Sequence, residues 1–289
     1  MNKPKVAIVG VGRWGRNVLR TLDSLSDLCE ISSVVFSGSK NTEQFLDECF
    51  ADLPRSHSIE TVLGNSAISH VFICTPIDSH YSLAKQCLLA GKHVFVEKPL
   101  SESVSEVEEL HELAQEQELN LTSGYIYLFE SGFRRLKHII NESKSVEVSM
   151  NWDKWGTFDS SIVSNLLVHE IALATNLIGP LTKIEESTIS ENQLAIKAQC
   201  QSGKLSISID RENKNRQKVL KAQVGSETYK LEAGNLYRLD GSGDVLEAEK
   251  DTDELLRIEL RSFLQQETPI GVADRHYASD AVPRAQCSL

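Results

Sequence analysis

The sequence of 289 residues lacks the hallmarks of several protein classes. It contains no run of about 18 apolar residues, so we expect no membrane-spanning helix. Its N-terminus, MNKPKVAIVGVG, leads directly into a strand pattern and lacks the organisation of a signal peptide. Lysine and arginine number 30 against 41 acidic residues, and the net charge of −11 disfavours contact with phosphate backbones. These absences predict a cytoplasmic protein that binds neither nucleic acid nor membranes.

Cysteine is scarce and scattered. The six cysteines stand at positions 29, 49, 74, 87, 200 and 287, and no two of them form a CxxC pair. A clustered zinc site therefore has no support, and most of the cysteines lie in apolar stretches that predict buried thiols. With 16 glycines and 7 prolines, the chain is also too poor in both to be collagenous or of low complexity. We expect neither a metal nor a disulfide.

The first 124 residues alternate short apolar runs with longer amphipathic ones. Helical stretches separate five runs that read as buried strands, at residues 5–9, 31–36, 70–74, 93–96 and 119–125. Continuous apolar strands joined by helices are typical of parallel βαβ units covered on both faces. The sequence therefore predicts an α/β fold in which residues 1–124 form a doubly wound, Rossmann-type parallel sheet.

Residues 125–289 have a different pattern of apolar and polar residues. Apolar and polar residues alternate in six segments, at 146–152, 183–189, 193–201, 204–210, 218–224 and 228–232. A period of two with short turns between segments predicts a largely antiparallel sheet with one solvent-exposed face. One helix, at about 162–178, interrupts the series. We therefore expect a second, α+β domain over residues 125–289.

A glycine-rich turn follows the first predicted strand. Gly10, Gly12 and Gly15 match GxGxxG, in which the glycines permit a tight turn, approach of a pyrophosphate and close packing of helix on strand. The N-terminus of the following helix offers free N–H groups to phosphates. In this context the motif predicts dinucleotide binding, with Arg13 and Trp14 also at the cofactor. A purely structural glycine turn is the alternative.

The end of the second strand indicates which dinucleotide is bound. An NAD-selecting site usually places an acidic residue there, which accepts a hydrogen bond from the ribose 2′-hydroxyl. Residues 36–41 read FSGSKN, without a carboxylate but with Ser37, Ser39 and Lys40, which could bind a 2′-phosphate. The sequence therefore favours NADP(H), with NAD(H) as the alternative. Lys40 could also simply face solvent.

Two further strand ends carry polar residues at the carboxyl edge of the sheet, where open α/β sheets bind ligands. These residues are Cys74, Thr75, Pro76 and His80 at the third strand, and Glu97 and Lys98 at the fourth. The proline after Lys98 keeps this lysine extended, so that its ammonium could bond a substrate oxygen or relay a proton. Taken alone, Lys98 is more simply interpreted as a surface lysine.

Three motifs together resemble one enzyme family. GVGRWG at residues 10–15, CTPIDSH at 74–80 and AGKHVFVEKPL at 90–100 are similar to the glucose–fructose oxidoreductase/inositol dehydrogenase (Gfo/Idh/MocA) family. The resemblance is strong over residues 3–130 and mainly architectural from there to about 272. It implies an NAD(P)-dependent oxidoreductase that acts on a sugar, sugar derivative or nucleotide-sugar, with Lys98 at the catalytic site. It also implies a homodimer or homotetramer joined through the exposed sheet face.

The same resemblance implies a second signature, an aspartate four residues before a histidine on a helix of the substrate domain. Asn165 and His169 occupy these positions, and their spacing places both on one helix face. His169 could exchange a proton with the reacting hydroxyl, or could be a satisfied histidine inside an apolar helix. Asn165 keeps the shape of the usual aspartate but loses its charge.

Two more residues are candidates for contact with substrate. Tyr125 follows the fifth strand, and Trp155 lies in an aromatic segment with Trp152 and Phe158, for which core packing is the alternative. Two other functions stay open. One is a biliverdin-reductase-like reductase of a non-sugar substrate. The other is a dinucleotide-binding regulator without catalysis, to which Asn165 and the short C-terminal tail point.

Overall fold

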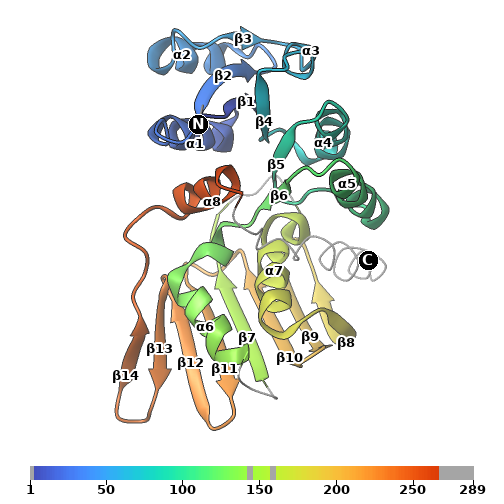
Figure 1. Cartoon of the computed structure of the whole chain (residues 1–289). Helices are drawn as coiled ribbons and strands as arrows, with labels where there is room; N and C mark the ends of the chain where they lie inside the picture. The colour runs from blue at the N-terminus through green and yellow to red at the C-terminus, as the bar shows by residue number, and fades with distance from the viewer. Residues whose placement is uncertain (1–2, 142–145, 157–160, 267–289) are drawn as a thin grey trace. The chain divides into compact units, whose positions relative to one another are not determined.

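The computed structural model describes residues 3–141, 146–156 and 161–266 (Figure 1). The described chain forms two compact units, one of residues 3–124 and 256–266 and the other of residues 125–255. Residues 256–266, from the end of the described chain, cluster with the first unit. Phe158 and the C-terminal tail from residue 267 lie outside the described residues.

The first unit contains a six-stranded sheet in the order β3-β2-β1-β4-β5-β6, with every neighbouring pair parallel. Its strands are β1 (Lys5–Val9), β2 (Glu30–Val35), β3 (Arg55–Ser56), β4 (Ile68–Ile73), β5 (His93–Glu97) and β6 (Leu121–Gly124). The strand order reverses between β1 and β4, which is the switch point where such sheets bind ligands. The predicted doubly wound α/β fold is confirmed, and the short edge strand β3 is additional.

Helices cover this sheet because its central strands are apolar on both faces. They are α1 (Arg13–Ser24), α2 (Lys40–Cys49), α3 (Glu60–Leu63), α4 (His80–Leu89), α5 (Val104–Glu116) and, from the end of the described chain, α8 (Leu255–Leu264). On α8, the ring of Phe263 lies 5.4 Å from that of Phe72, 5.7 Å from that of Phe95 and 5.6 Å from that of His70, between centroids. This aromatic contact explains why α8 belongs to the first unit.

The second unit contains an eight-stranded sheet in the order β14-β13-β12-β11-β7-β10-β9-β8. Its strands are β7 (Val146–Asp153), β8 (Leu181–Ile189), β9 (Gln193–Cys200), β10 (Gly203–Asp210), β11 (Lys218–Val224), β12 (Glu227–Glu232), β13 (Asn235–Leu239) and β14 (Asp244–Ala248). Every neighbouring pair is antiparallel except β7 and β10. The largely antiparallel sheet is confirmed, and β13 and β14 extend it beyond the six predicted segments.

Two helices, α6 (Ser131–Asn141) and α7 (Val168–Ile178), lie over one face of this sheet (Figure 1). Successive side chains along a strand point to opposite faces of the sheet, so that Val148 and Met150 are buried while Ser149 between them is exposed. The opposite face carries short polar side chains, among them Ser149, Ser206 and Ser208, which line a groove of about 420 Å³. None of the helices described is both long and apolar enough to span a bilayer.

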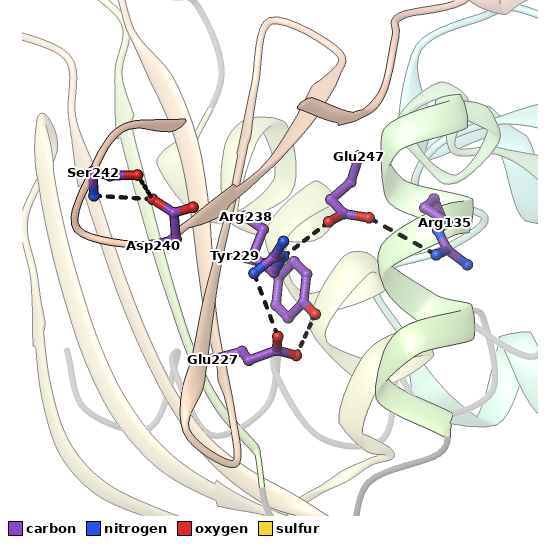
Figure 2. A network of polar contacts seen from close by, with 7 residues as sticks. All are labelled: Arg135, Glu227, Tyr229, Arg238, Asp240, Ser242 and Glu247. Carbon is purple, nitrogen blue, oxygen red and sulfur yellow. Dashed lines mark hydrogen bonds and ion pairs between the residues drawn. The ribbon is translucent and has the colours of Figure 1, made fainter. Parts of the chain in front are cut away.

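A network of polar contacts connects strands β12, β13 and β14 with helix α6 (Figure 2). Arg238 lies between two carboxylates, with its Nε 3.0 Å from Glu247 and its Nη1 3.7 Å from Glu227. Glu227 also accepts the hydroxyl of Tyr229, and Glu247 lies 3.9 Å from Arg135 of α6. The network joins neighbouring strands and the helix above them, although pairs this exposed contribute little stability each.

Candidate active site

The glycine turn has the geometry that a bound pyrophosphate requires. Gly10 has a φ of 92°, and a Cβ there would lie 2.7 Å from the carbonyl oxygen of Cys74. A Cβ on Gly15 would lie 2.1 Å from the oxygen of Gly10, so α1 packs against the turn at a distance that only glycine allows. At Gly12, the N-cap of α1, a Cβ would meet no described atom within 4 Å, and no side chain caps the helix. The turn therefore leaves open space in front of the positive end of α1.

The segment after β2 presents polar residues at the start of α2. Ser37 and Lys40 are exposed. Ser39 is the N-cap of α2, where its Oγ accepts the Thr42 N–H at 3.3 Å and donates to the Thr42 hydroxyl at 2.8 Å. Its hydroxyl therefore caps the helix, a structural role beside the predicted contact with the cofactor. Arg16 of α1, which the sequence did not single out, donates to the backbone and side-chain oxygens of Asn41 at 2.9 Å each.

The loop after β4 is fixed by a buried histidine. Cys74 continues the parallel pairing by donating its N–H to the oxygen of Val9 at 2.8 Å. The two ring nitrogens of His80 each lie 2.8 Å from a carbonyl oxygen, one of Thr75 and the other of Pro99. Burial lowers the pKa of His80, and the two carbonyl oxygens oppose this shift. His80 thus ties together the loops that follow β4 and β5.

Glu97 and Lys98 stand at the carboxyl end of β5. The indole N–H of Trp14, on the first turn of α1, donates to the Glu97 carboxylate. Burial raises the pKa of Glu97 to about 7, against the opposing effects of Trp14 and Lys98. Lys98 is half-buried and precedes Pro99 through a cis peptide bond. The structure therefore gathers the glycine turn and the ends of β2, β4 and β5 at one edge of the sheet.

In the second unit, His169 lies among aromatic rings. The helix predicted over 162–178 contains a π-helical turn, Val163–Leu167, that passes directly into α7. Asn165 lies in the π turn and His169 in the first turn of α7, and both are half-buried. The His169 ring lies 5.2 Å from that of Tyr127, 5.8 Å from Trp152 and 6.3 Å from Tyr125. Single π turns inside helices occur frequently at functional sites.

A buried ion pair lies beside this histidine. Lys218 Nζ, at the start of β11, lies 2.8 Å from Oε1 of Glu170, whose side chain is only 2% exposed. The same ammonium is 3.4 Å from the ring centroid of Tyr127 and 4.1 Å from that of Trp152, so two aromatic faces cover it. Burial raises the pKa of nearby Glu130 to about 7, although Lys218 opposes this shift. None of these three charged residues stands out in the sequence, because their contacts join distant segments.

The two tryptophans of β7 and the residues after it differ in exposure. Trp152 is buried, as core packing predicts, whereas Trp155 is 47% exposed. Lys214 Nζ and Arg216 Cζ lie 6.0 and 5.6 Å from the ring centroid of Trp155. Tyr125, the other proposed substrate contact, is buried. Within the described parts of the chain, no group of three or more histidine, cysteine or acidic residues could hold a metal ion.

A doubly wound sheet with an open glycine turn at its switch point defines a dinucleotide-binding domain. Residues 4–125 match the family described as "Oxidoreductase family, NAD-binding Rossmann fold". The first unit therefore matches the Gfo/Idh/MocA oxidoreductase family, and the resemblance inferred from the three motifs is confirmed for this domain.

Individual relatives are similar over parts of the chain. Scyllo-inositol 2-dehydrogenase (NADP(+)) of Bacillus subtilis is 28% identical over 145 residues, which are 50% of this chain and 39% of that protein. Biliverdin reductase A of Mus musculus is 29% identical over 147 residues, which are 51% of this chain and 48% of that protein. These alignments thus cover less than half of either relative.

A solved structure is similar over the full length. UDP-N-acetylglucosamine 3-dehydrogenase of Acidithiobacillus ferrooxidans superposes with a TM-score of 0.86, covering 100% of this chain and 98% of the other, at 16% identity. The similarity at this identity establishes the two-domain fold.

Proposed function

We propose that the protein is an NADP(H)-dependent oxidoreductase that transfers a hydride between the nicotinamide and a carbinol or carbonyl carbon of a sugar-like substrate. One observation carries the proposal. The first turn of α1 is uncapped by any described side chain, and a Cβ at Gly12 would meet only open space. A pyrophosphate would satisfy the free N–H groups there and use the helix dipole.

The proposed preference for NADP(H) is supported by the start of α2. Ser37 and Lys40 are exposed beside the helix N-terminus, and residues 36–41 contain no carboxylate that could accept a ribose hydroxyl. A 2′-phosphate would pair with the Lys40 ammonium and gain from the dipole of α2. Thr75, Pro76 and Glu97 are proposed to line the same cofactor site further along the edge.

Lys98 and His169 are proposed to handle the hydroxyl proton. When bound, the nicotinamide supplies the hydride acceptor or donor. In the oxidation direction, the substrate O–H proton passes to Lys98 or His169 as the carbinol becomes a carbonyl. In the reduction direction, the same group returns a proton to the oxygen. Asn165 is proposed to orient the imidazole, and Tyr125 to contact the substrate.

Turnover with a panel of free, phosphorylated and nucleotide-linked sugars tests this assignment. Lys98→Met and His169→Asn should each lower kcat by about 10²–10⁴-fold, the usual contribution of a proton-transfer group, while NADPH affinity is retained. Lys85→Met is the matched control, since it removes a half-exposed lysine that contacts Glu109 and Tyr81. If both variants kept full turnover, the proposed roles would be wrong.

A bilin is the second candidate substrate. It is favoured by the similarity to biliverdin reductase A, which spans 147 residues at 29% identity. Biliverdin therefore belongs in the panel, and its reduction in preference to every sugar would replace the sugar assignment.

We also propose that the open face of the eight-stranded sheet joins copies of the chain into a homodimer or homotetramer. The short side chains of Ser149, Ser206 and Ser208 along its groove leave room for a close approach of a second sheet. Light scattering coupled to size-exclusion chromatography measures the assembly mass directly. The mass of a single chain at micromolar concentration would contradict this proposal.

A further inference from the structure

The ammonium of Lys218 lies against two aromatic rings of the second unit. Its Nζ is 3.4 Å from the ring centroid of Tyr127 and 4.1 Å from that of Trp152. Burial raises the pKa of Tyr127 to about 12, so its phenol is neutral and its ring face attracts a cation. Lys218 begins β11, Trp152 belongs to β7, and Tyr127 belongs to the short helical turn Ile126–Phe129. One charge therefore connects three segments that are far apart in the sequence.

The same two rings contact His169. The imidazole lies 5.2 Å from the ring of Tyr127 and 5.8 Å from that of Trp152, between centroids. The two rings also contact each other, 5.8 Å apart and perpendicular. Glu170, which follows His169 in the chain, pairs with Lys218 Nζ at 2.8 Å. The contacts thus form a closed set, in which Lys218 holds both the rings beside the imidazole and the helical turn that carries it.

A closed set of contacts restricts the orientation of the imidazole. Any large movement of Tyr127 or Trp152 would cost its contact with the ammonium, so the two rings present a fixed surface to His169. The family resemblance implies an aspartate at position 165 that orients the histidine, whereas Asn165 carries no charge. The orientation of His169 therefore depends more strongly on the rings that pack against it.

We propose that Lys218 is a positioning residue for His169. Its ammonium holds the rings of Tyr127 and Trp152, and these rings set the orientation of the imidazole for proton exchange. The inference rests on the proposed function, since it takes His169 as a group that exchanges a proton with the substrate. Such a group is sensitive to its position, because a misplacement of about 1 Å can cost about 10²-fold in rate.

Three variants separate positioning from stability. Lys218→Met removes the cation and leaves Glu170 without its counter-ion, so it also destabilises the unit. The double variant Lys218→Met/Glu170→Met replaces the pair by apolar side chains, which regains stability but leaves the rings without their cation. Lys218→Arg keeps a cation that stacks on aromatic faces. Burial raises the pKa of Glu130 to about 7 against the effect of Lys218, so without this lysine Glu130 takes up a proton more readily.

NMR of the full chain with labelled aromatic residues tests the inference without a substrate. His169→Asn identifies the imidazole signals of His169 among the eight histidines. We expect the NOEs from this imidazole to the rings of Tyr127 and Trp152 to weaken or disappear in both methionine variants. They should persist in Lys218→Arg and in the control Lys183→Met, which removes an exposed lysine from β8. Urea denaturation of the same samples measures their stability.

Turnover gives a second readout with any sugar of the panel that reacts. The double variant should lower kcat by up to about 10²-fold with KM within about twofold of the wild type, as expected when only the transition state loses an interaction. Wild-type NOEs and full kcat in the double variant would overturn the inference, since Lys218 would then serve stability alone. Equal loss of the NOEs in Lys183→Met would also contradict it. Full turnover of His169→Asn would instead reject the proposed function, so the two failures are distinguishable.

Discussion

Lys218 Nζ and Glu170 Oε1 form an ion pair of 2.8 Å in which the carboxylate side chain is 2% exposed. Glu170 follows His169 directly in the chain, so a buried, compensated charge pair supports the turn of helix that carries the candidate catalytic histidine. The family resemblance implies a carboxylate at position 165, where this chain has a neutral asparagine. Glu170, the carboxylate that follows His169, is itself compensated by Lys218.

Removing the lysine should destabilise the second unit. Lys218→Met leaves the Glu170 carboxylate buried without its counter-ion, and breaking a buried pair from one side costs about 3–5 kcal/mol. Urea denaturation measures the loss in the free energy of unfolding. Lys197→Met, which breaks an exposed pair with Glu186, should cost at most about 1 kcal/mol. Equal losses in the two variants would show that the buried pair has no special importance.

Two alanine substitutions should separate binding from stability at the glycine turn. Gly12→Ala adds a Cβ where no described atom lies within 4 Å, so unfolding should shift by less than about 0.5 kcal/mol while NADPH affinity falls at least about tenfold. Gly15→Ala places a Cβ 2.1 Å from the oxygen of Gly10, so it should cost about 1–3 kcal/mol of stability as well. Unchanged NADPH affinity in Gly12→Ala would place the pyrophosphate elsewhere.

Acid should weaken the first unit through His70. Burial lowers its pKa from 6.5 to about 4, so between these values the unfolded chain binds more protons than the folded one. Stability therefore falls as pH drops from 6.5 to 4, by up to about 3 kcal/mol, and is regained above that window. His70→Phe keeps a ring against Phe263 but cannot titrate. We expect its stability to fall less than that of the wild type over this window, and parallel profiles would contradict the assignment.

Trp14 should report the ionisation of Glu97. The carboxyl has a pKa of about 7 because it is buried, and it accepts the indole N–H of Trp14. The charge on this acceptor changes through neutral pH, so the fluorescence of Trp14 should change with a midpoint near pH 7. Trp14→Phe isolates its contribution from those of Trp152 and Trp155. The midpoint should disappear in Glu97→Gln, and a midpoint that persists would belong to another group.

Much of the first unit could be predicted because its signals are local. Continuous apolar strands alternate with amphipathic helices, and the glycine turn lies directly between β1 and α1. The contact of α8 with the first unit could not be predicted, because Phe263 meets His70 and Phe72 across almost 200 residues of chain. The strand β14 was missed because its first residues, including Val245 and Leu246, are exposed and leave only a weak alternation.

In the candidate site too, residues in local motifs could be predicted, whereas residues that act through long-range contacts could not. Lys98 and His169 could be predicted from motifs, since each lies in a short run of characteristic sequence. Lys218 carries no such signal: it begins an ordinary alternating strand, and its partner Glu170 lies 48 positions earlier in the helix α7. The helix α6 did leave a signal, since Phe133, Leu136 and Ile140 recur at helical spacing and are buried.

The first unit is proposed to bind NADP(H) for a redox reaction. Titration of the purified protein with NADPH and, separately, with NADH, followed by nicotinamide fluorescence, measures this binding. We expect micromolar affinity for NADPH and at least about tenfold weaker affinity for NADH, because Ser37 and Lys40 favour a 2′-phosphate. Equal or tighter binding of NADH would contradict the 2′-phosphate assignment. Absence of binding by both nucleotides would contradict the oxidoreductase itself.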